Sequence, residues 1–240
     1  MGYFIDTHFH LDHYRNYTDL IEEINKLQQY TVCVTNSPGV FLSCKNMLPE
    51  SKYLKFAIGF HPQEKNLSHT DLKDFLRLID RTNYVGEVGL DFSSDAYRDR
   101  NAQIDAFEQI TQKCARDNKM MIVHIRRSEE LAIDIIRRYA PKKCIIHWYT
   151  GSEKHLQQLL DAGCFFSINA NMISSNSSDK YRAIPNDRRL VESDGPYTKV
   201  GGEKYAPSLL PAVYLEIARF YNDPDFILHT YQNFQRLLTL

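Results

Sequence analysis

The sequence predicts an α/β protein whose strands close into a (β/α)8 TIM-type barrel, with extra helices at the C-terminal end. Short apolar runs rich in β-branched and aromatic residues alternate with helical patterns, which is typical of parallel βαβ units. Eight such runs occur, the strand number of a closed barrel. A doubly wound open sheet is the alternative, but no G-x-G-x-x-G follows the first run.

The expected elements occupy most of the chain, and we expect one domain spanning 1–240. The strands are expected at 3–6, 31–35, 54–59, 84–87, 120–125, 144–147, 164–168 and 189–192. The helices are expected at 20–29, 41–48, 70–79, 101–118, 129–139, 153–161, 181–184, 208–221 and 225–238. The irregular segments 169–179 and 197–206 are expected as loops at one mouth of the barrel.

Composition excludes several classes of protein. The chain is 43% hydrophobic and 25% charged, which is ordinary for a globular protein. No apolar run is long enough to span a bilayer, so we expect no membrane partner. The net charge of -1 means that any nucleic-acid contact must come from a local basic patch. The five cysteines show no C-x-x-C spacing, and three of them lie in apolar, strand-like runs, so we expect these three to be buried free thiols and the protein to be cytoplasmic.

Histidines and acids fall at the carboxyl ends of most expected strands. His8 and His10 end the first strand, and the others follow in chain order: His61, Glu87, His124, His147 and Asp194. In a barrel these ends converge on the mouth where active sites lie. Four of these imidazoles, all but His61, and the two carboxylates predict a divalent-metal site holding one or two ions, with Glu87 able to bridge because a carboxylate has two oxygens.

Each of these residues taken alone has a simpler interpretation. An H-x-H pair is a weak signal, Glu87 or Asp194 alone is more often a helix cap or an arginine partner, and a single strand-end histidine is often a core residue. The shared position at one end of most strands favours the metal site. For His61 three roles stay open: metal ligand, phosphate donor or acid catalyst. Asp6 is expected behind the ligands, where a carboxylate orients an imidazole.

Residues beside the expected ligands suggest an anionic substrate. Arg126 shares the strand face of His124 and is a candidate forked donor for phosphate, although either Arg126 or Arg127 can be an ordinary surface charge. Trp148 and Tyr149 follow His147 and are candidates for stacking a base, or for packing at the barrel rim. Four basic residues near the mouth loops can form a positive patch or be solvated: Lys180, Arg182, Lys199 and Lys204.

The motifs resemble those of the TatD-type metal-dependent deoxyribonucleases, a branch of the amidohydrolase-like, metallo-dependent hydrolase barrels. The matching motifs are FIDTHFHLD, AIGFHPQ, VGEVGLDF, VHIRRS, IIHWYTGS, VESDGPY and NFQRLL. The resemblance implies that one ion is held by His8, His10, Glu87 and Asp194, and a second by Glu87, His124 and His147. It further implies that His61 and Arg126 contact the scissile phosphate of DNA.

Two departures from the family pattern bear on substrate preference. The family usually has Cys-Phe in place of Trp148-Tyr149, and Thr-Asp-Ala in place of Ser193-Asp194-Gly195. The motifs HWYTGS, GCFFSINANM and TVCVTNSPGVF look more like the QatD nuclease of Qat anti-phage systems. That likeness implies work on DNA ends, single-stranded or frayed, beside other proteins of a defence operon.

The resulting hypothesis is phosphodiester hydrolysis by a water activated between two ions of Mg, Mn or Zn, with Asp194 accepting its proton. His61 and Glu87 complete the expected catalytic set. One alternative is a D-aminoacyl-tRNA deacylase or amidase, because the same ligands can direct water at a carbonyl. Another is a non-catalytic DNA-end-binding subunit of a defence complex.

Overall fold

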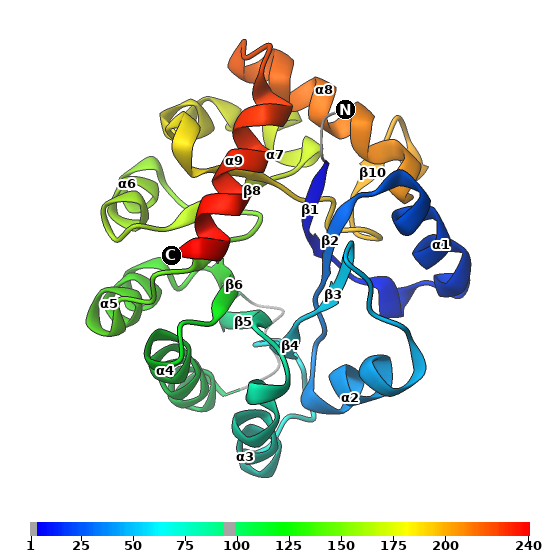
Figure 1. The fold of residues 1–240 in the computed structure, drawn as a ribbon. Helices are drawn as coiled ribbons and strands as arrows, with labels where there is room; N and C mark the ends of the chain where they lie inside the picture. The colour runs from blue at the N-terminus through cyan, green and yellow to red at the C-terminus, as the bar shows by residue number, and fades with distance from the viewer. Residues whose placement is uncertain (1–3, 94–98) are drawn as a thin grey trace.

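The computed structural model describes residues 4–93 and 99–240, and these form a (β/α)8 barrel with a ring of helices around the strands (Figure 1). The strands are β1 (Ile5–Phe9), β2 (Tyr30–Cys33), β3 (Leu54–Phe56), β4 (Ile58–Phe60), β5 (Tyr84–Asp91), β6 (Met120–Arg126), β7 (Cys144–Ile146), β8 (Phe165–Ile168) and β9 (Arg189–Val191). The helices are α1 (Tyr17–Leu27), α2 (Pro38–Met47), α3 (His69–Leu78), α4 (Arg100–Arg116), α5 (Glu129–Tyr139), α6 (Glu153–Asp161), α7 (Ala170–Ser174), α8 (Leu210–Tyr221) and α9 (Phe226–Thr239).

Two seams close the ring of parallel strands. The strands pair in the orders β1-β2-β3 and β4-β5-β6-β7-β8-β9. β3 and β4 belong to one run interrupted at Ala57, whose N–H donates to the carbonyl of Cys33 at 2.8 Å. On the other side, the N–H of Asp194 donates to the carbonyl of His8 at 2.8 Å, and the N–H of His10 donates to Gly195 at 3.0 Å. These bonds exclude the open sheet.

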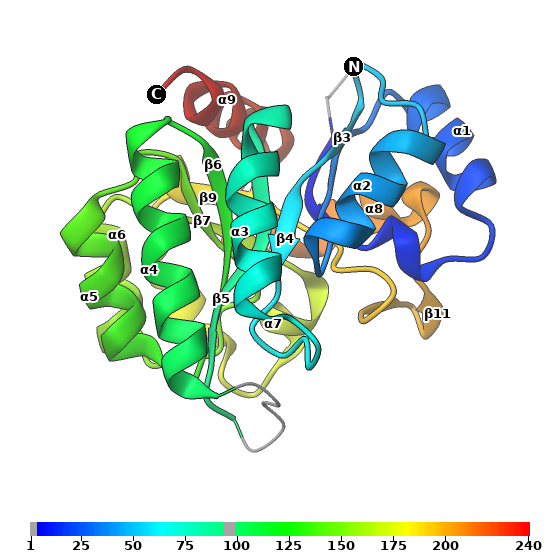
Figure 2. The same ribbon diagram turned by 90° about the horizontal axis from the view of Figure 1, so that it is seen from below.

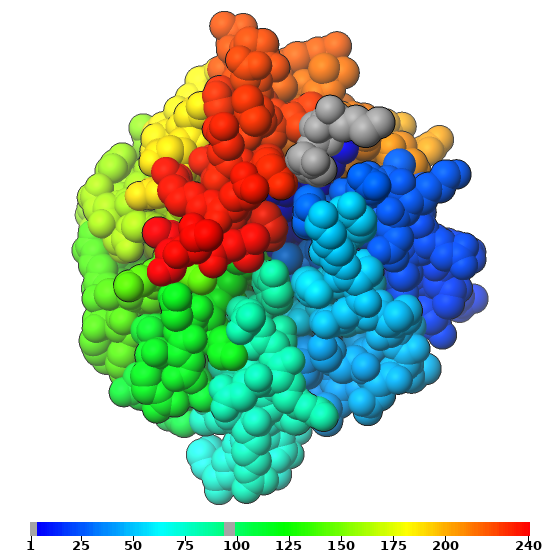
Figure 3. All heavy atoms as spheres, in the orientation of Figure 1, coloured from blue at the N-terminus to red at the C-terminus, as the bar shows by residue number. Residues whose placement is uncertain are grey.

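Helix α9 covers the end of the barrel where the strands begin. It crosses the strands in Figure 1, and its atoms spread over this end in the space-filling view of Figure 3. Its Phe234 and Leu237 pack in a buried cluster with β-strand residues that include Ile5 and Leu190. The view in Figure 2 places α9 at the opposite end of the molecule from α7 and β11 (Glu203–Lys204). The apolar base of the barrel is therefore sealed, and the other end is left for the site.

The side chains that face the barrel interior change from apolar to polar along the strands. Met120 and Ile122 of β6 belong to the same interior cluster as Phe234. His124 lies two residues further along β6 and therefore faces the interior as well. The same alternation leads from Ile145 of β7 to His147. Strand parity thus places apolar residues near α9 and histidines at the far end.

Several expected elements differ from the observed ones. Segment 169–179 was expected as a loop but contains α7, because the Asn169 side chain caps it by accepting from the N–H of Met172 at 3.0 Å. The expected helix at 181–184 is instead a 3-10 turn, Ser178–Ala183. Segment 197–206 contains a short antiparallel hairpin of β10 (Lys199–Val200) and β11. The first strand starts later than expected and runs to Phe9; residue 3 lies outside the described residues.

The remaining composition-based predictions can be compared directly with the structure. All five cysteines are buried free thiols, which includes the three for which burial was expected. Among the described residues, no helix is long and apolar enough to cross a membrane.

Candidate metal centre

A cavity of about 870 Å³ opens at the polar end of the barrel. Its lining includes all but two of the residues predicted to form the site: His10, His61, Glu87, His124, Arg126, His147, Trp148 and Asp194. Of the other two, His8 lies fully buried within contact distance of Glu87 and Asp194. Residues separated by up to 186 positions in the sequence therefore meet around one space, because the ends of parallel strands converge there.

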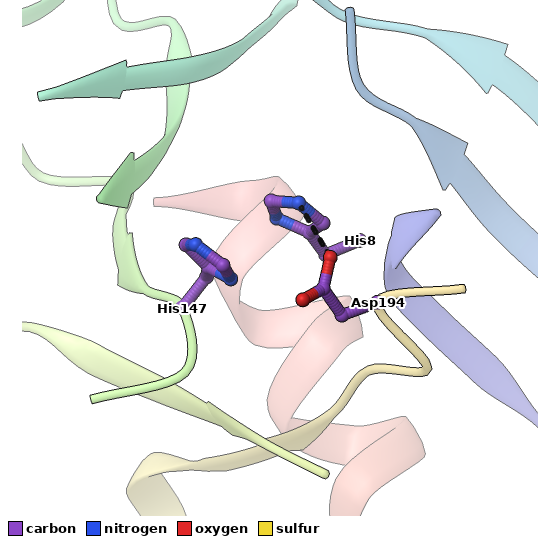
Figure 4. Close-up of side chains that lie close together, drawn as sticks. All are labelled: His8, His147 and Asp194. Atoms are coloured by element: carbon purple, nitrogen blue, oxygen red, sulfur yellow. Dashed lines mark ion pairs between the residues drawn. The ribbon is translucent and has the colours of Figure 1, made fainter. Parts of the chain in front are cut away.

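The first group of donor atoms comes from β1 and from the segment after β9. The Nε2 atoms of His8 and His10 lie 3.1 Å apart. Oδ1 of Asp194 lies 3.4 Å from Nε2 of His8 and 3.5 Å from Nε2 of His10. Figure 4 shows Asp194 turned toward His8, with His147 on the other side of the space. Oε2 of Glu87 completes the group at 3.4 Å from both Nε2 atoms.

The second group gathers around the other oxygen of Glu87. Oε1 lies 2.7 Å from Nδ1 of His124, 3.0 Å from Nε2 of His147 and 3.1 Å from Nε2 of His61. Glu87 thus presents one oxygen to each group of imidazoles. It does so from the middle of β5, which continues to Asp91, so the expectation that Glu87 ends its strand is wrong. The bulge between Val85 and Val88 shifts the strand register at this position.

Burial and neighbouring charges shift the pKa values in this cluster. Burial raises the pKa of Asp194 to about 8, against the pull of nearby imidazoles. Burial also acts to raise the pKa of Glu87, but His61 and His147 hold it well below its usual range. Burial and His147 lower the pKa of His8 to about 3. His8 is therefore a neutral imidazole, the form that offers a lone pair to a metal ion.

Comparison with known proteins identifies the family. The TatD related DNase family matches residues 5–239. This chain belongs to the TatD family. Among its relatives is the uncharacterized metal-dependent hydrolase YcfH of Escherichia coli K12, 27% identical over 98% of this chain and 95% of its own. The human 3'-5' RNA nuclease TATDN2 is 25% identical over 98% of this chain and 32% of its own length.

A solved structure supports the same fold for the TatD-family chain. The E. coli TatD homologue YJJV matches with a TM-score of 0.86 and 20% identity, covering 99% of this chain and 98% of its own. At that identity the likeness concerns the fold alone. The barrel prediction is confirmed.

The donor atoms of this TatD protein fit divalent metal ions. Four sets of side chains among the described residues place one ligand atom each within 4.8 Å of one another. Three of them draw on the two donor groups: His8 with His147 and Asp194, His8 with His10 and Glu87, and His61 with Glu87 and His124. Oδ1 of Asp194 is buried and accepts no hydrogen bond from the described residues. A buried carboxylate oxygen beside two imidazole lone pairs needs a cation or protons to satisfy it. Imidazole and carboxylate donors accept several divalent ions.

Of the two aromatic residues predicted to contact substrate, one lies away from the cavity. Tyr149 is fully buried, its hydroxyl donates to the carbonyl of Ser152 at 2.8 Å, and its ring packs against Phe166, so its prediction as a substrate contact is wrong. Trp148 lines the cavity. The backbone turns at Trp148, where φ is +33°, so the following side chain points into the helix layer.

The basic residues also separate into two sets. Arg126 and Arg127 line the cavity. Neither guanidinium has a hydrogen-bond or ion-pair partner in the part of the chain that the structure describes. The four other basic residues lie outside the cavity lining. Lys180, for example, donates to the carbonyls of Thr150 and Gly151 at 3.0 and 2.7 Å. The local positive charge at the mouth therefore comes from the two arginines after His124.

Asp6 was expected to orient an imidazole but does not contact one. Its Oδ1 accepts the N–H groups of His8 at 3.3 Å and Ser193 at 2.9 Å, and its Oδ2 accepts the hydroxyl of Tyr205 at 3.0 Å. Asp6 therefore fastens β1 to the segment after β9. Burial raises its pKa to about 7.

Three residues near the donor groups were not singled out from the sequence. Asp91 contacts His124, Glu192 lies beside His147, and Tyr197 is 55% exposed at the rim of the cavity. Strand parity indicates the face on which Asp91 and Glu192 lie, although it does not indicate which histidines they contact. Asp91 shares its face with Glu87 four residues earlier, and Glu192 shares its face with Asp194.

Proposed function

We propose that this protein is a metal-dependent hydrolase that cleaves phosphodiester bonds at single-stranded or frayed DNA ends. The observation that carries the proposal is Glu87, whose two oxygens face two separate groups of imidazole donors. Arg126 lines the same cavity, its guanidinium has no partner within residues 4–93 and 99–240, and it adds the donor geometry suited to phosphate. The family description as TatD related DNase supports the same chemistry.

Two positions for divalent ions follow from the donor groups. His8, His10, Asp194 and Oε2 of Glu87 would hold one ion. His124, His147 and Oε1 of Glu87 would hold the other. When bound, such ions supply a water of lowered pKa and neutralise charge on phosphoryl oxygens.

Asp194 is placed to accept the proton of the attacking water. Its carboxylate faces the cavity, and it lies on the backbone segment after β9 that is bonded to β1. In the reaction the water oxygen bonds to phosphorus, and Asp194 takes the proton from the water. The bond from phosphorus to the leaving oxygen breaks, and that oxygen keeps the electron pair and takes a proton from His61 or from solvent. The bonds to β1 keep the carboxylate beside the first donor group.

The hydrogen bonds of His61 favour one of its three possible roles. Its Nδ1 accepts the backbone N–H of Gln63 at 3.1 Å. A neutral imidazole with an acceptor at Nδ1 carries its proton on Nε2. That Nε2, 3.1 Å from Glu87, is therefore a donor and not a metal ligand. We assign His61 to donate to a phosphate oxygen or to the leaving oxygen.

Arg126 and Trp148 are assigned to the substrate. Arg126 binds a phosphate, and Trp148 offers the one indole of the chain as a stacking surface for a base. Stacking and phosphate contacts are tolerant of sequence, so we expect digestion with little base preference.

The test is cleavage of end-labelled oligonucleotides by metal-stripped protein resupplied with Mg, Mn or Zn. Single-stranded DNA, duplex DNA and RNA are compared, because the relative TATDN2 is named an RNA nuclease. Arg126→Ala should raise KM. Arg182→Ala is the matched control, because Arg182 lies outside the cavity and donates to the carbonyl of Phe220. Equal KM values in the two variants would contradict the role of Arg126.

Other outcomes of the assay would favour the alternatives. Release of the amino acid from D-aminoacyl-tRNA without cleavage of any oligonucleotide would favour a deacylase. Metal-dependent binding of DNA ends without turnover would favour a non-catalytic subunit. Association with other proteins of a defence operon is a further proposal, supported by the motif resemblance alone, and co-purification with co-expressed operon neighbours tests it.

A further inference from the structure

A buried carboxylate lies behind His124, on the side away from the donor group. Oδ2 of Asp91 is 2.9 Å from Nε2 of His124 and also accepts the side-chain amide of Gln63 at 2.7 Å. Oδ1 of Asp91 accepts the backbone N–H of Ser93 at 2.8 Å. Carboxylate oxygens, which only accept, lie on both sides of this ring: Glu87 at Nδ1 and Asp91 at Nε2. With a cation between Nδ1 and Glu87, the proton of a neutral His124 is on Nε2, where Asp91 accepts it. Its Nδ1, which faces Glu87, then carries the lone pair.

A second buried carboxylate lies behind His147. Oε1 of Glu192 is 3.6 Å from Nδ1 of His147. The carboxylate is held in place by the N–H of Trp148 at 3.0 Å, by the amide of Asn169 at 2.9 Å and by the hydroxyl of Ser167. The charge of Glu192 thus favours the proton of His147 on Nδ1. Its Nε2 faces Glu87.

His8 of β1 and His10, the residue after β1, have no carboxylate behind their rings. Nδ1 of each is buried and has no hydrogen-bond partner among residues 4–93 and 99–240. Nδ1 of His147 also makes no hydrogen bond there, but it lies at ion-pair distance, 3.6 Å, from Glu192. Within the same residues, no carboxylate pairs with Nδ1 of His8 or of His10; their ion pairs are all made through Nε2. The two donor groups that share Glu87 therefore differ in what lies behind their imidazoles.

We propose that Asp91 and Glu192 are positioning residues for the ion held by His124 and His147. They fix which ring nitrogen faces the ion and make that nitrogen a stronger donor, as carboxylates behind metal-ligating histidines do. The inference rests on the metal site of the proposed function. It adds that the two ion positions are supported differently, so that removing either carboxylate weakens one binding step and spares the other.

Asp91→Asn is the sharpest perturbation. Asp91 uses one oxygen for Ser93 and the other for His124 and Gln63, whereas asparagine has a single acceptor oxygen. Its amide group must face either Ser93 N–H or His124. With the amide toward His124, the proton of the ring moves to Nδ1 and the lone pair that faces Glu87 is lost.

The measurements are calorimetric titration of metal-stripped protein with Mn²⁺ or Zn²⁺, and ¹⁵N chemical shifts of the histidine rings. In Asp91→Asn we expect one of two binding steps to weaken by about 10- to 100-fold, with the other unchanged. The ¹⁵N shifts of His124 should report a proton moved from Nε2 to Nδ1. Glu192→Gln should weaken the same binding step without moving the proton of His124. If Asp91→Asn does not fold, Glu192→Gln alone tests the inference.

Asp223→Asn is the matched control. Asp223 pairs with Nδ1 of His229 at 2.8 Å, outside the cavity lining, so its loss should leave both binding steps unchanged. Unaltered metal affinities in both Asp91→Asn and Glu192→Gln would overturn the inference while leaving the proposed function intact. A wild-type protein that binds no divalent ion would overturn both.

Discussion

Replacing Glu87 by glutamine tests whether one carboxylate serves both donor groups. In the wild type, Oε1 lies 2.7 Å from Nδ1 of His124, and Oε2 lies 3.4 Å from Nε2 of His8. Glutamine keeps the shape of the side chain but has one oxygen. Its amide group therefore turns N–H donors toward one of the two groups. We expect Glu87→Gln to lose at least one of the two ion positions.

The expected rise in Tm on adding metal follows from the linkage between metal binding and folding. An ion present at about 100 times its dissociation constant adds about 2.7 kcal/mol to the free energy of unfolding, so two ions add about 5.4 kcal/mol. For a protein of this length, each kcal/mol raises Tm by about 2–4 °C, which gives about 11–22 °C for the wild type. In Glu87→Gln one remaining ion gives a rise of at most about half that amount.

The assay is thermal unfolding of metal-stripped protein with and without Mn²⁺ or Zn²⁺, with bound metal counted by elemental analysis. Comparing each variant with and without metal removes any difference in the stability of the metal-free protein. Glu216→Gln on α8 is the control, because Glu216 is exposed and lies outside the cavity. If metal raises the Tm of Glu87→Gln as much as that of the wild type, Glu87 does not serve both donor groups. The same conclusion follows if metal does not raise the Tm of the wild type.

Three further predictions concern catalysis, substrate and stability. Asp194→Asn should lower kcat by about 10²- to 10⁴-fold with an unchanged circular dichroism spectrum, since it removes the proton acceptor; near-normal cleavage of labelled DNA would contradict its role. Trp148→Ala should raise KM by about 5- to 150-fold, equivalent to about 1–3 kcal/mol of lost stacking, with equal KM values counting against a base contact. Phe234→Ala should lower the free energy of unfolding in urea by about 3–5 kcal/mol, because Phe234 is 4% exposed beneath the barrel. Leu238→Ala, at a 41% exposed position of the same helix, should change that free energy by less than about 1 kcal/mol.

Local pattern was sufficient to predict the barrel and the gathering of the donor residues. Alternation along β6 puts His124 on the same face as Met120 and Ile122, whatever the neighbouring strands do. Parallel strands then bring His8 and Asp194 to the same mouth from opposite ends of the chain. Both inferences depend on backbone geometry that every strand shares. Of the basic residues considered from the sequence, Arg126 and Arg127 line the cavity, whereas Lys180, Arg182, Lys199 and Lys204 lie outside its lining.

What the sequence did not predict depends on backbone turns and on contacts between distant segments. The turn at Trp148 breaks the alternation, so Tyr149 enters the helix layer and not the cavity. The side chain of Asn169 caps a helix, α7, in the segment 169–179, whose composition had suggested a loop.

By itself the sequence therefore determined the fold class and which residues meet at the mouth, because strand periodicity and strand direction are local properties. Only the tertiary structure decided how those residues face one another. The register between β5 and its neighbours, shifted at a bulge, turns the two oxygens of Glu87 toward different groups. It also brings Asp91 behind His124. Such contacts are set by distances between strands that are far apart in the chain, and no single-strand pattern encodes them.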